Sequence, residues 1–88
     1  MSGRGPFKVL ITRRAEKDIQ KLHPRTRGKL AEILRNRIAM DPLSGKKLLG
    51  ELSGCWSVRL NIRDRIVYRV DLATRTVYIL RARTHYEP

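Results

Sequence analysis

The residues best suited to chemistry in this chain of 88 residues lie in its C-terminal third, where arginine recurs and a histidine–tyrosine pair comes near the end. Arginine stays charged at neutral pH and can bind two oxygens of a phosphate or carboxylate at once. The unperturbed pKa of a histidine side chain is about 6.5, so His85 can accept or release a proton near neutrality. Tyr86 offers a ring that can stack on a nucleobase. These residue types favour acid–base chemistry beside an anionic group.

The composition indicates a polyanionic partner. The formal net charge is +12, and arginines outnumber lysines by more than two to one. This bias favours bidentate contacts with phosphate or carboxylate over a diffuse positive coat. Nucleic acid fits the charge, because binding it releases counterions, and a very acidic protein fits it as well. We expect no membrane partner, because no basic helix carries bulky aromatic residues on its opposite side.

Few residues suit a metal or cofactor site. Cys55 is the single cysteine, and with His23 and His85 it matches no spacing typical of zinc ligands. The glycine-rich stretch 45–54 does not place its lysines and serine in the arrangement of a phosphate-binding loop. We therefore expect neither metal nor cofactor. No apolar run approaches the roughly 18 residues of a membrane span, and no signal peptide opens the chain, which predicts a cytoplasmic protein.

Hydrophobic spacing predicts two helices early in the chain. Ala15, Ile19 and Leu22 recur at helical spacing, and Thr12 can cap the helix that they form. A second apolar stripe runs through a longer helix, while arginines and a lysine occupy its other sides. Pro42 ends this second helix, because proline lacks the backbone donor and restricts the residue before it. The expected helices cover residues 13–22 and 25–40.

β-Branched and alternating residues predict four strands, over residues 7–12, 56–61, 65–70 and 77–83. Residues 43–54 are expected to form a loop with one short extended piece. In the last three strands we expect the even-numbered residues to face the core, which are Trp56, Val58, Leu60, Ile66, Tyr68, Val70, Tyr78, Leu80 and Ala82.

This order predicts an α+β fold of two layers, β-α-α-β-β-β, in which an antiparallel meander sheet packs on two helices and leaves its other face open. Residues 1–6 are expected to form a flexible tail, and residues 7–88 a single domain.

Three short motifs then resemble a known family. They are Leu-Ser-Gly-Cys-Trp-Ser-Val-Arg at 52–59, Arg-Ile-Val-Tyr at 65–68, and Arg-Thr-His-Tyr at 83–86. In this order and spacing they look like the RelE/ParE toxin superfamily, and most like its YoeB-type branch. The resemblance implies the RelE-like fold and a ribosome-dependent mRNA endonuclease of a type II toxin–antitoxin system. Its partners would be the ribosome, the mRNA in the A site and an acidic cognate antitoxin.

The resemblance also implies roles for individual residues. Arg59 and Arg65 match arginines that face the substrate phosphate, Arg83 precedes the terminal pair, and His85 matches the catalytic histidine. Tyr86 matches the terminal tyrosine of the family. Metal-free cleavage of RNA needs a base for the 2′-OH, cations for the phosphate and an acid for the leaving oxygen. The expected catalytic set is therefore Arg59, Arg65, Arg83, His85 and Tyr86, with Lys46, Lys47 and Arg81 binding substrate.

One role of the YoeB-type pattern has no match. These proteins carry a glutamate in the loop before Leu-Ser-Gly, where this chain has Lys46 or Lys47. The identity of the general base therefore stays open between His85, a lysine with a depressed pKa and Glu51. Two other readings also stay open: a ParE-like inhibitor of DNA gyrase, and a relative that binds antitoxin or RNA without cutting. The terminal His85–Tyr86 pair favours the RNA-cleaving branch.

Overall fold

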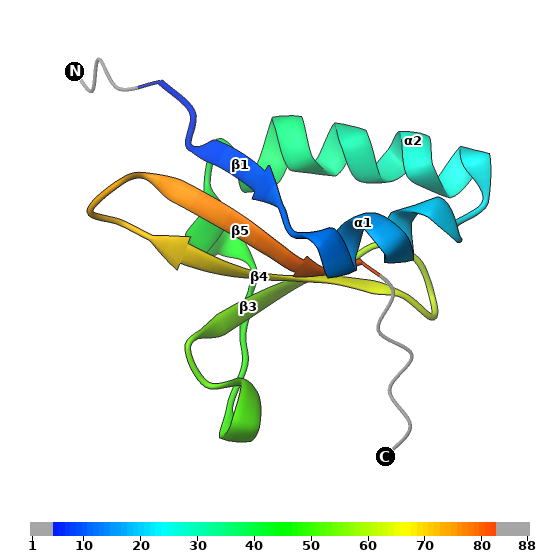
Figure 1. Cartoon of the computed structure of the whole chain (residues 1–88). Coiled ribbons are helices and arrows are strands. Elements are labelled where there is room, and N and C mark those ends of the chain that lie inside the picture. The colour runs from blue at the N-terminus through cyan, green and yellow to red at the C-terminus, as the bar shows by residue number, and fades with distance from the viewer. Residues whose placement is uncertain (1–4, 83–88) are drawn as a thin grey trace.

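The computed structural model describes residues 5–82, and its two helices lie together over one side of a twisted sheet (Figure 1). The strands are β1 (Lys8–Ile11), β2 (Lys46–Lys47), β3 (Cys55–Arg59), β4 (Arg65–Asp71) and β5 (Thr76–Arg81). The helices are α1 (Arg13–Gln20) and α2 (Pro24–Ile33), and α2 continues into a π-helical turn, η1 (Leu34–Ile38). Short 3₁₀ turns at Pro42–Ser44 and Gly50–Leu52 flank β2. The predicted α+β class is confirmed.

The sheet has five strands in the order β1-β5-β4-β3-β2. The predicted antiparallel meander β3-β4-β5 is confirmed, and the short extended piece expected in the loop is β2, which pairs antiparallel with β3. β1 instead runs parallel to β5, so the whole sheet is mixed and not purely antiparallel. The helices α1 and α2 connect β1, at one edge of the sheet, to β2, at the opposite edge.

Both helices begin at side-chain caps. The Thr12 hydroxyl oxygen accepts from the Ala15 amide at 3.2 Å and donates to the Ile79 carbonyl at 2.8 Å, which ties the start of α1 to β5. His23 Nδ1 accepts from the Arg25 amide at 3.1 Å, and Pro24 occupies the first turn of α2. In place of the single helix expected over 25–40, the structure has α2 followed by η1, so the last part of this helix has the wider π-helical turn.

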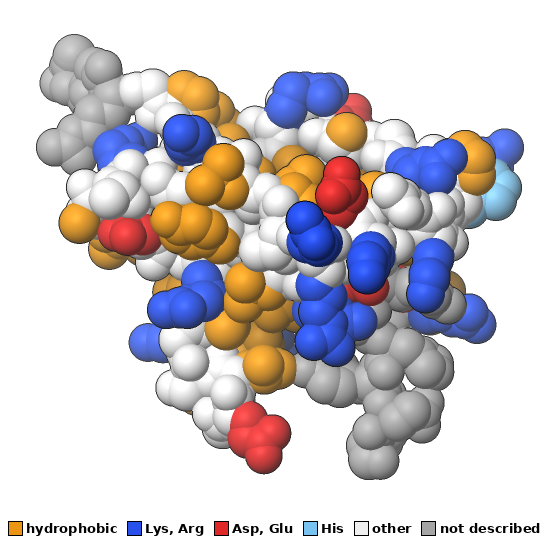
Figure 2. All heavy atoms as spheres, viewed as in Figure 1, with side chains coloured by type: hydrophobic (Ala, Val, Ile, Leu, Met, Phe, Trp, Pro, Cys, Tyr) orange, Lys and Arg blue, Asp and Glu red, His pale blue; other side chains and the backbone are white. Residues whose placement is uncertain are grey.

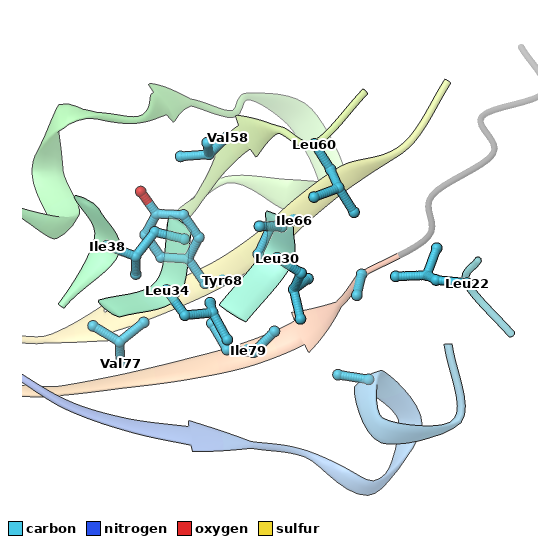
Figure 3. Close-up of a cluster of buried hydrophobic side chains, with 12 residues drawn as sticks. Leu22, Leu30, Leu34, Ile38, Val58, Leu60, Ile66, Tyr68, Val77 and Ile79 are labelled. Atoms are coloured by element: carbon cyan, nitrogen blue, oxygen red, sulfur yellow. The ribbon is translucent and has the colours of Figure 1, made fainter. Parts of the chain in front are cut away.

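The core lies between the helices and the inner face of the sheet (Figure 3). Tyr68 is fully buried, and its hydroxyl donates to the Pro42 carbonyl at 2.6 Å. Burial raises the pKa of Tyr68 to about 12, because the phenolate would lose its hydration. The buried cluster consists of Ala15, Leu22, Leu30, Leu34, Ile38, Val58, Leu60, Ile66, Tyr68, Val77, Ile79 and Ala82.

The predicted inward residues of the last strand are partly wrong. Val77 and Ile79 are fully buried, whereas Tyr78 is 36% exposed. Tyr68 pairs with Ile79, but its neighbour Val67 pairs with Arg81, so one residue of β5 has no opposite partner. This β-bulge reverses the alternation, which is why Ala82 is buried as predicted while Tyr78 is not.

Candidate functional site

A polar pocket of about 400 Å³ opens where η1, the loop before β2, and strands β3 and β4 meet. Among the described residues that line it, four are cations and none is an acid, so the pocket favours an anionic ligand. Its volume lies within the range of about 300 to 1,000 Å³ that is usual for small-ligand sites. The lining consists of Arg37, Ser44, Gly45, Lys46, Ser57, Val58, Arg59 and Arg65.

Two predicted phosphate-binding residues, Arg59 and Arg65, meet in this pocket. They end β3 and begin β4, and they are direct partners in the antiparallel register. Arg59 is exposed and Arg65 half-buried. Like charges directly opposite each other destabilise a strand pair. The hairpin therefore places two guanidinium groups where an anion between them would relieve their repulsion.

The two loop lysines separate in the structure. Lys46 pairs with Ser57 and lines the pocket. Lys47, the next residue on the strand, pairs with Trp56, and its Nζ lies 6.0 Å from the centroid of the indole ring. Neighbouring residues of a strand point to opposite faces. Lys46 therefore joins the two arginines, and Lys47 does not line the same pocket.

Gly45 sets how closely the lysine loop approaches the sheet. A Cβ atom added there would overlap the Tyr68 hydroxyl and come within 2.8 Å of the Ser57 carbonyl oxygen. The absence of a side chain thus lets this backbone pack directly on β3 and on the buried tyrosine. This close packing positions Lys46 at the mouth of the pocket.

Arg37 also lines the pocket, although its spacing in the sequence predicted only an exposed side of a helix. It lies in η1, and its Nε and Nη2 donate to the hydroxyl and carbonyl oxygens of Ser44 at 3.4 and 3.3 Å. The chain turns at Pro42, and this turn brings Ser44 back toward the helix. A linear pattern gives no signal for such a contact.

Arg81 ends β5, where it pairs with Val67 of β4 and binds an acid of α1. Its Nε donates to Asp18 at 2.7 Å, and the Ala82 amide donates to the same carboxylate oxygen at 3.1 Å. In the structure Arg81 thus contacts helix α1, and its expected contact with substrate stays a prediction. The expected site residues Arg83, His85 and Tyr86 lie outside the described residues, as do residues 1–4 of the expected tail.

On the face of the molecule shown in Figure 2, lysine and arginine side chains are spread over the surface and outnumber the acidic ones. Among residues 5–82, no group of three or more histidine, cysteine or acidic side chains is placed to hold a metal ion. Within the same range, no helix has both the length and the apolar character needed to cross a bilayer.

The sequence profile of one family, described as the YoeB-like toxin of bacterial type II toxin–antitoxin systems, matches residues 13–86. The chain belongs to this family. The toxin RelG of Mycobacterium tuberculosis is 38% identical to this YoeB-like toxin over 77 residues, which cover 86% of this chain and 87% of RelG.

Solved structures show the same fold. The RelBE2 toxin–antitoxin complex from M. tuberculosis contains a chain that superposes with a TM-score of 0.82 at 36% identity, covering 92% of this chain and 99% of that one. The YoeB–YefM complex from Staphylococcus aureus gives 0.74 at 26% identity, with coverage of 91% and 98%. The YoeB-like toxin therefore has the RelE-like architecture that its motifs predict.

The pocket of this YoeB-like toxin has a lining suited to an anion. Arg37, Lys46, Arg59 and Arg65 can bind an anion and stabilise negative charge that grows on it. Among the described residues, the lining of the pocket includes neither histidine nor an acid. A reaction that moves a proton at this pocket would need a side chain from another part of the toxin.

Proposed function

We propose that this toxin is a ribosome-dependent endoribonuclease that cuts mRNA in the ribosomal A site. The observation that carries the proposal is the pocket that Lys46, Arg59 and Arg65 line together, with no acid among its described lining residues. An RNA phosphate is negatively charged and therefore complements the cations of this pocket. Membership of the YoeB-like toxin family supports the same substrate class.

The proposed reaction needs no metal. A base removes the proton of the ribose 2′-OH, the resulting oxygen attacks the adjacent phosphorus, and the bond from phosphorus to the 5′-oxygen breaks as an acid protonates that oxygen. Arg59 and Arg65 stabilise the charge on the non-bridging oxygens, with Arg83 as a supporting cation. His85 is the leading acid–base group, and Tyr86 orients the nucleotide.

We further propose that a cognate antitoxin neutralises this toxin. The structures of similar toxins from M. tuberculosis and S. aureus are complexes with their antitoxins. The whole chain has a formal net charge of +12, and the cationic surface around Arg59 and Arg65 suits an acidic antitoxin segment. Affinity for the antitoxin should fall steeply as salt is added, because salt screens exposed charges. An affinity that stays constant over a wide range of salt would contradict this neutralisation mechanism.

The nuclease proposal is tested by induced expression and mapping of 5′ ends on a translated message by primer extension. New ends inside translated codons are expected for the wild type and for Arg63→Ala, since exposed Arg63 does not line the pocket. They should disappear in His85→Ala and fall sharply in Arg65→Ala. Growth arrest without cuts would overturn the proposal and favour a gyrase target. Cuts that persist in His85→Ala would remove His85 from the mechanism.

A further inference from the structure

Arg37 enters the pocket from the helical layer, whereas Arg59 and Arg65 enter it from the sheet. We infer that Arg37 is a further substrate-binding residue of this site and holds a phosphate of the RNA chain from the helical side. The inference rests on the proposed RNA substrate. It assigns to the pocket a contact that the three sequence motifs do not include.

The guanidinium of Arg37 is already held in place. Its contacts with Ser44 use Nε–H and one N–H of Nη2. A guanidinium has five N–H donors, so the remaining donors can reach a ligand. The hydroxyl of Ser44 in turn donates to the Asp41 carbonyl at 2.8 Å, which fixes the acceptor. A side chain that is ordered before binding loses less conformational entropy when the ligand arrives.

The charge balance around Arg37 favours an anion. Lys46, Arg59 and Arg65 line the same pocket, and none of its lining residues within 5–82 is an acid. Asp41, the nearest acid after Arg37 in the chain, lies outside the lining. Within the part of the chain that the structure describes, a salt bridge joins Arg81 to Asp18, and neither of these residues lines the pocket. Four cations that line one small space repel one another, and a phosphate would offset that repulsion.

Arg37 lies in the π-helical turn that ends the helical layer. Through η1 the Ala39 amide bonds to the Leu34 carbonyl at 2.9 Å, five residues back, so the turn is wider than in an α-helix. Such turns are frequent at functional sites. Arg35, two residues before Arg37, lines a different and mainly apolar groove beside β1. Both arginines are exposed, so Arg35 is a matched control for Arg37.

The test measures binding of a short fluorescent 2′-O-methyl RNA to the full chain by fluorescence anisotropy over a range of KCl concentrations. The 2′-O-methyl group prevents 2′-OH attack, so binding is measured apart from cleavage and from the ribosome. Arg37→Gln should weaken binding several-fold and lower the slope of log K against log[salt] by about 0.7, the value for one phosphate contact in a single strand. Arg37→Lys should keep the slope, and Arg35→Gln should leave affinity near that of the wild type.

Urea unfolding verifies that these exposed variants remain folded. Equal losses in Arg37→Gln and Arg35→Gln would overturn the inference, because net charge alone would then explain both. The variant Arg65→Gln distinguishes a failure of the inference about Arg37 from a failure of the proposed RNA site. If Arg65→Gln weakens RNA binding and Arg37→Gln does not, the inference fails while the proposed RNA site stands. If neither variant weakens binding, the proposed RNA site fails as well.

Discussion

Arg59 and Arg65 lie directly opposite each other where β3 ends and β4 begins. The turn between them is closed by Asn61, whose side-chain oxygen accepts from the Arg63 and Asp64 amides at 2.8 and 2.7 Å. The Leu60 amide also donates to the Asp64 carbonyl at 2.9 Å. This closed hairpin fixes the register, so the two arginines cannot separate without breaking it. A like-charge pair held in this way is typical of a site that binds an anion.

Removing one of these arginines should raise stability and lower activity together. Arg65→Gln relieves the cross-strand repulsion and should increase the free energy of unfolding by roughly 0.5 kcal/mol. The same change should sharply reduce mRNA cutting, because a phosphate contact is lost. Urea unfolding and primer extension measure the two effects, with Arg63→Gln as the control. A variant that is less stable yet fully active would contradict this account of the pair.

The contact between Asp18 and the end of β5 should matter for both stability and function. Asp18→Asn removes the charge that holds Arg81 and weakens the bond from the Ala82 amide. Hydrogen bonds to charged groups contribute about 1.5 to 3 kcal/mol, so we expect the free energy of unfolding to fall by roughly 2 kcal/mol. Because Arg83 and His85 follow directly in the chain, cutting by the folded variant should fall as well.

Glu16→Gln is the control for Asp18, since Glu16 is exposed on the same helix. Its unfolding midpoint in urea should stay close to that of the wild type. Equal midpoints for Asp18→Asn and the wild type would show that the bond between α1 and β5 contributes little.

Two glycine-to-alanine changes should act in opposite directions. Gly45→Ala places a methyl group against the Tyr68 hydroxyl and the Ser57 carbonyl, which should destabilise the protein by about 1 to 3 kcal/mol and displace Lys46. Gly28→Ala lies inside α2 with no atom within 4 Å of the added Cβ, so it should stabilise the protein by about 0.5 to 1 kcal/mol. Thermal or urea unfolding of both variants checks the opposite signs.

Tyr68 should make the protein sensitive to strong alkali. Its pKa is about 12 in the folded state and about 10 when unfolded. Between these two values the unfolded chain releases the phenol proton and the folded chain keeps it, so stability falls as pH rises. The loss from this group should reach roughly 2 kcal/mol near pH 12.

Urea unfolding of the wild type and Tyr68→Phe across this range isolates the contribution of the phenol. Near pH 8 the variant should be less stable by about 1 kcal/mol, because it lacks the hydrogen bond to Pro42. The difference between the two proteins should then shrink to zero at about pH 11, and by pH 12 the variant should be the more stable by about 1 kcal/mol. A difference that stays constant would show that Tyr68 ionises equally easily in both states.

The elements of the fold could be predicted from the sequence because they depend on local periodicity. The apolar spacing around Ala15 and Leu30 gave the helices, and the alternation around Val58 and Ile66 gave the inward faces of β3 and β4. The motifs predicted that Arg59 and Arg65 face one substrate phosphate, and in the structure both line one pocket. These signals are local because a helix or strand repeats within a few residues.

The tertiary structure decided what depends on distant segments. A bulge in β5 turned Tyr78 outward, the fold paired Arg81 with Asp18, and the turn at Pro42 brought Ser44 to Arg37. Each of these results follows from the register between strands or from the packing of a loop on a helix. The sequence by itself determined the family and the basic character of this toxin, because composition and short motifs are local properties. Only the folded chain determined which cations share a pocket, because that pocket joins segments from Arg37 to Arg65 that no local spacing relates.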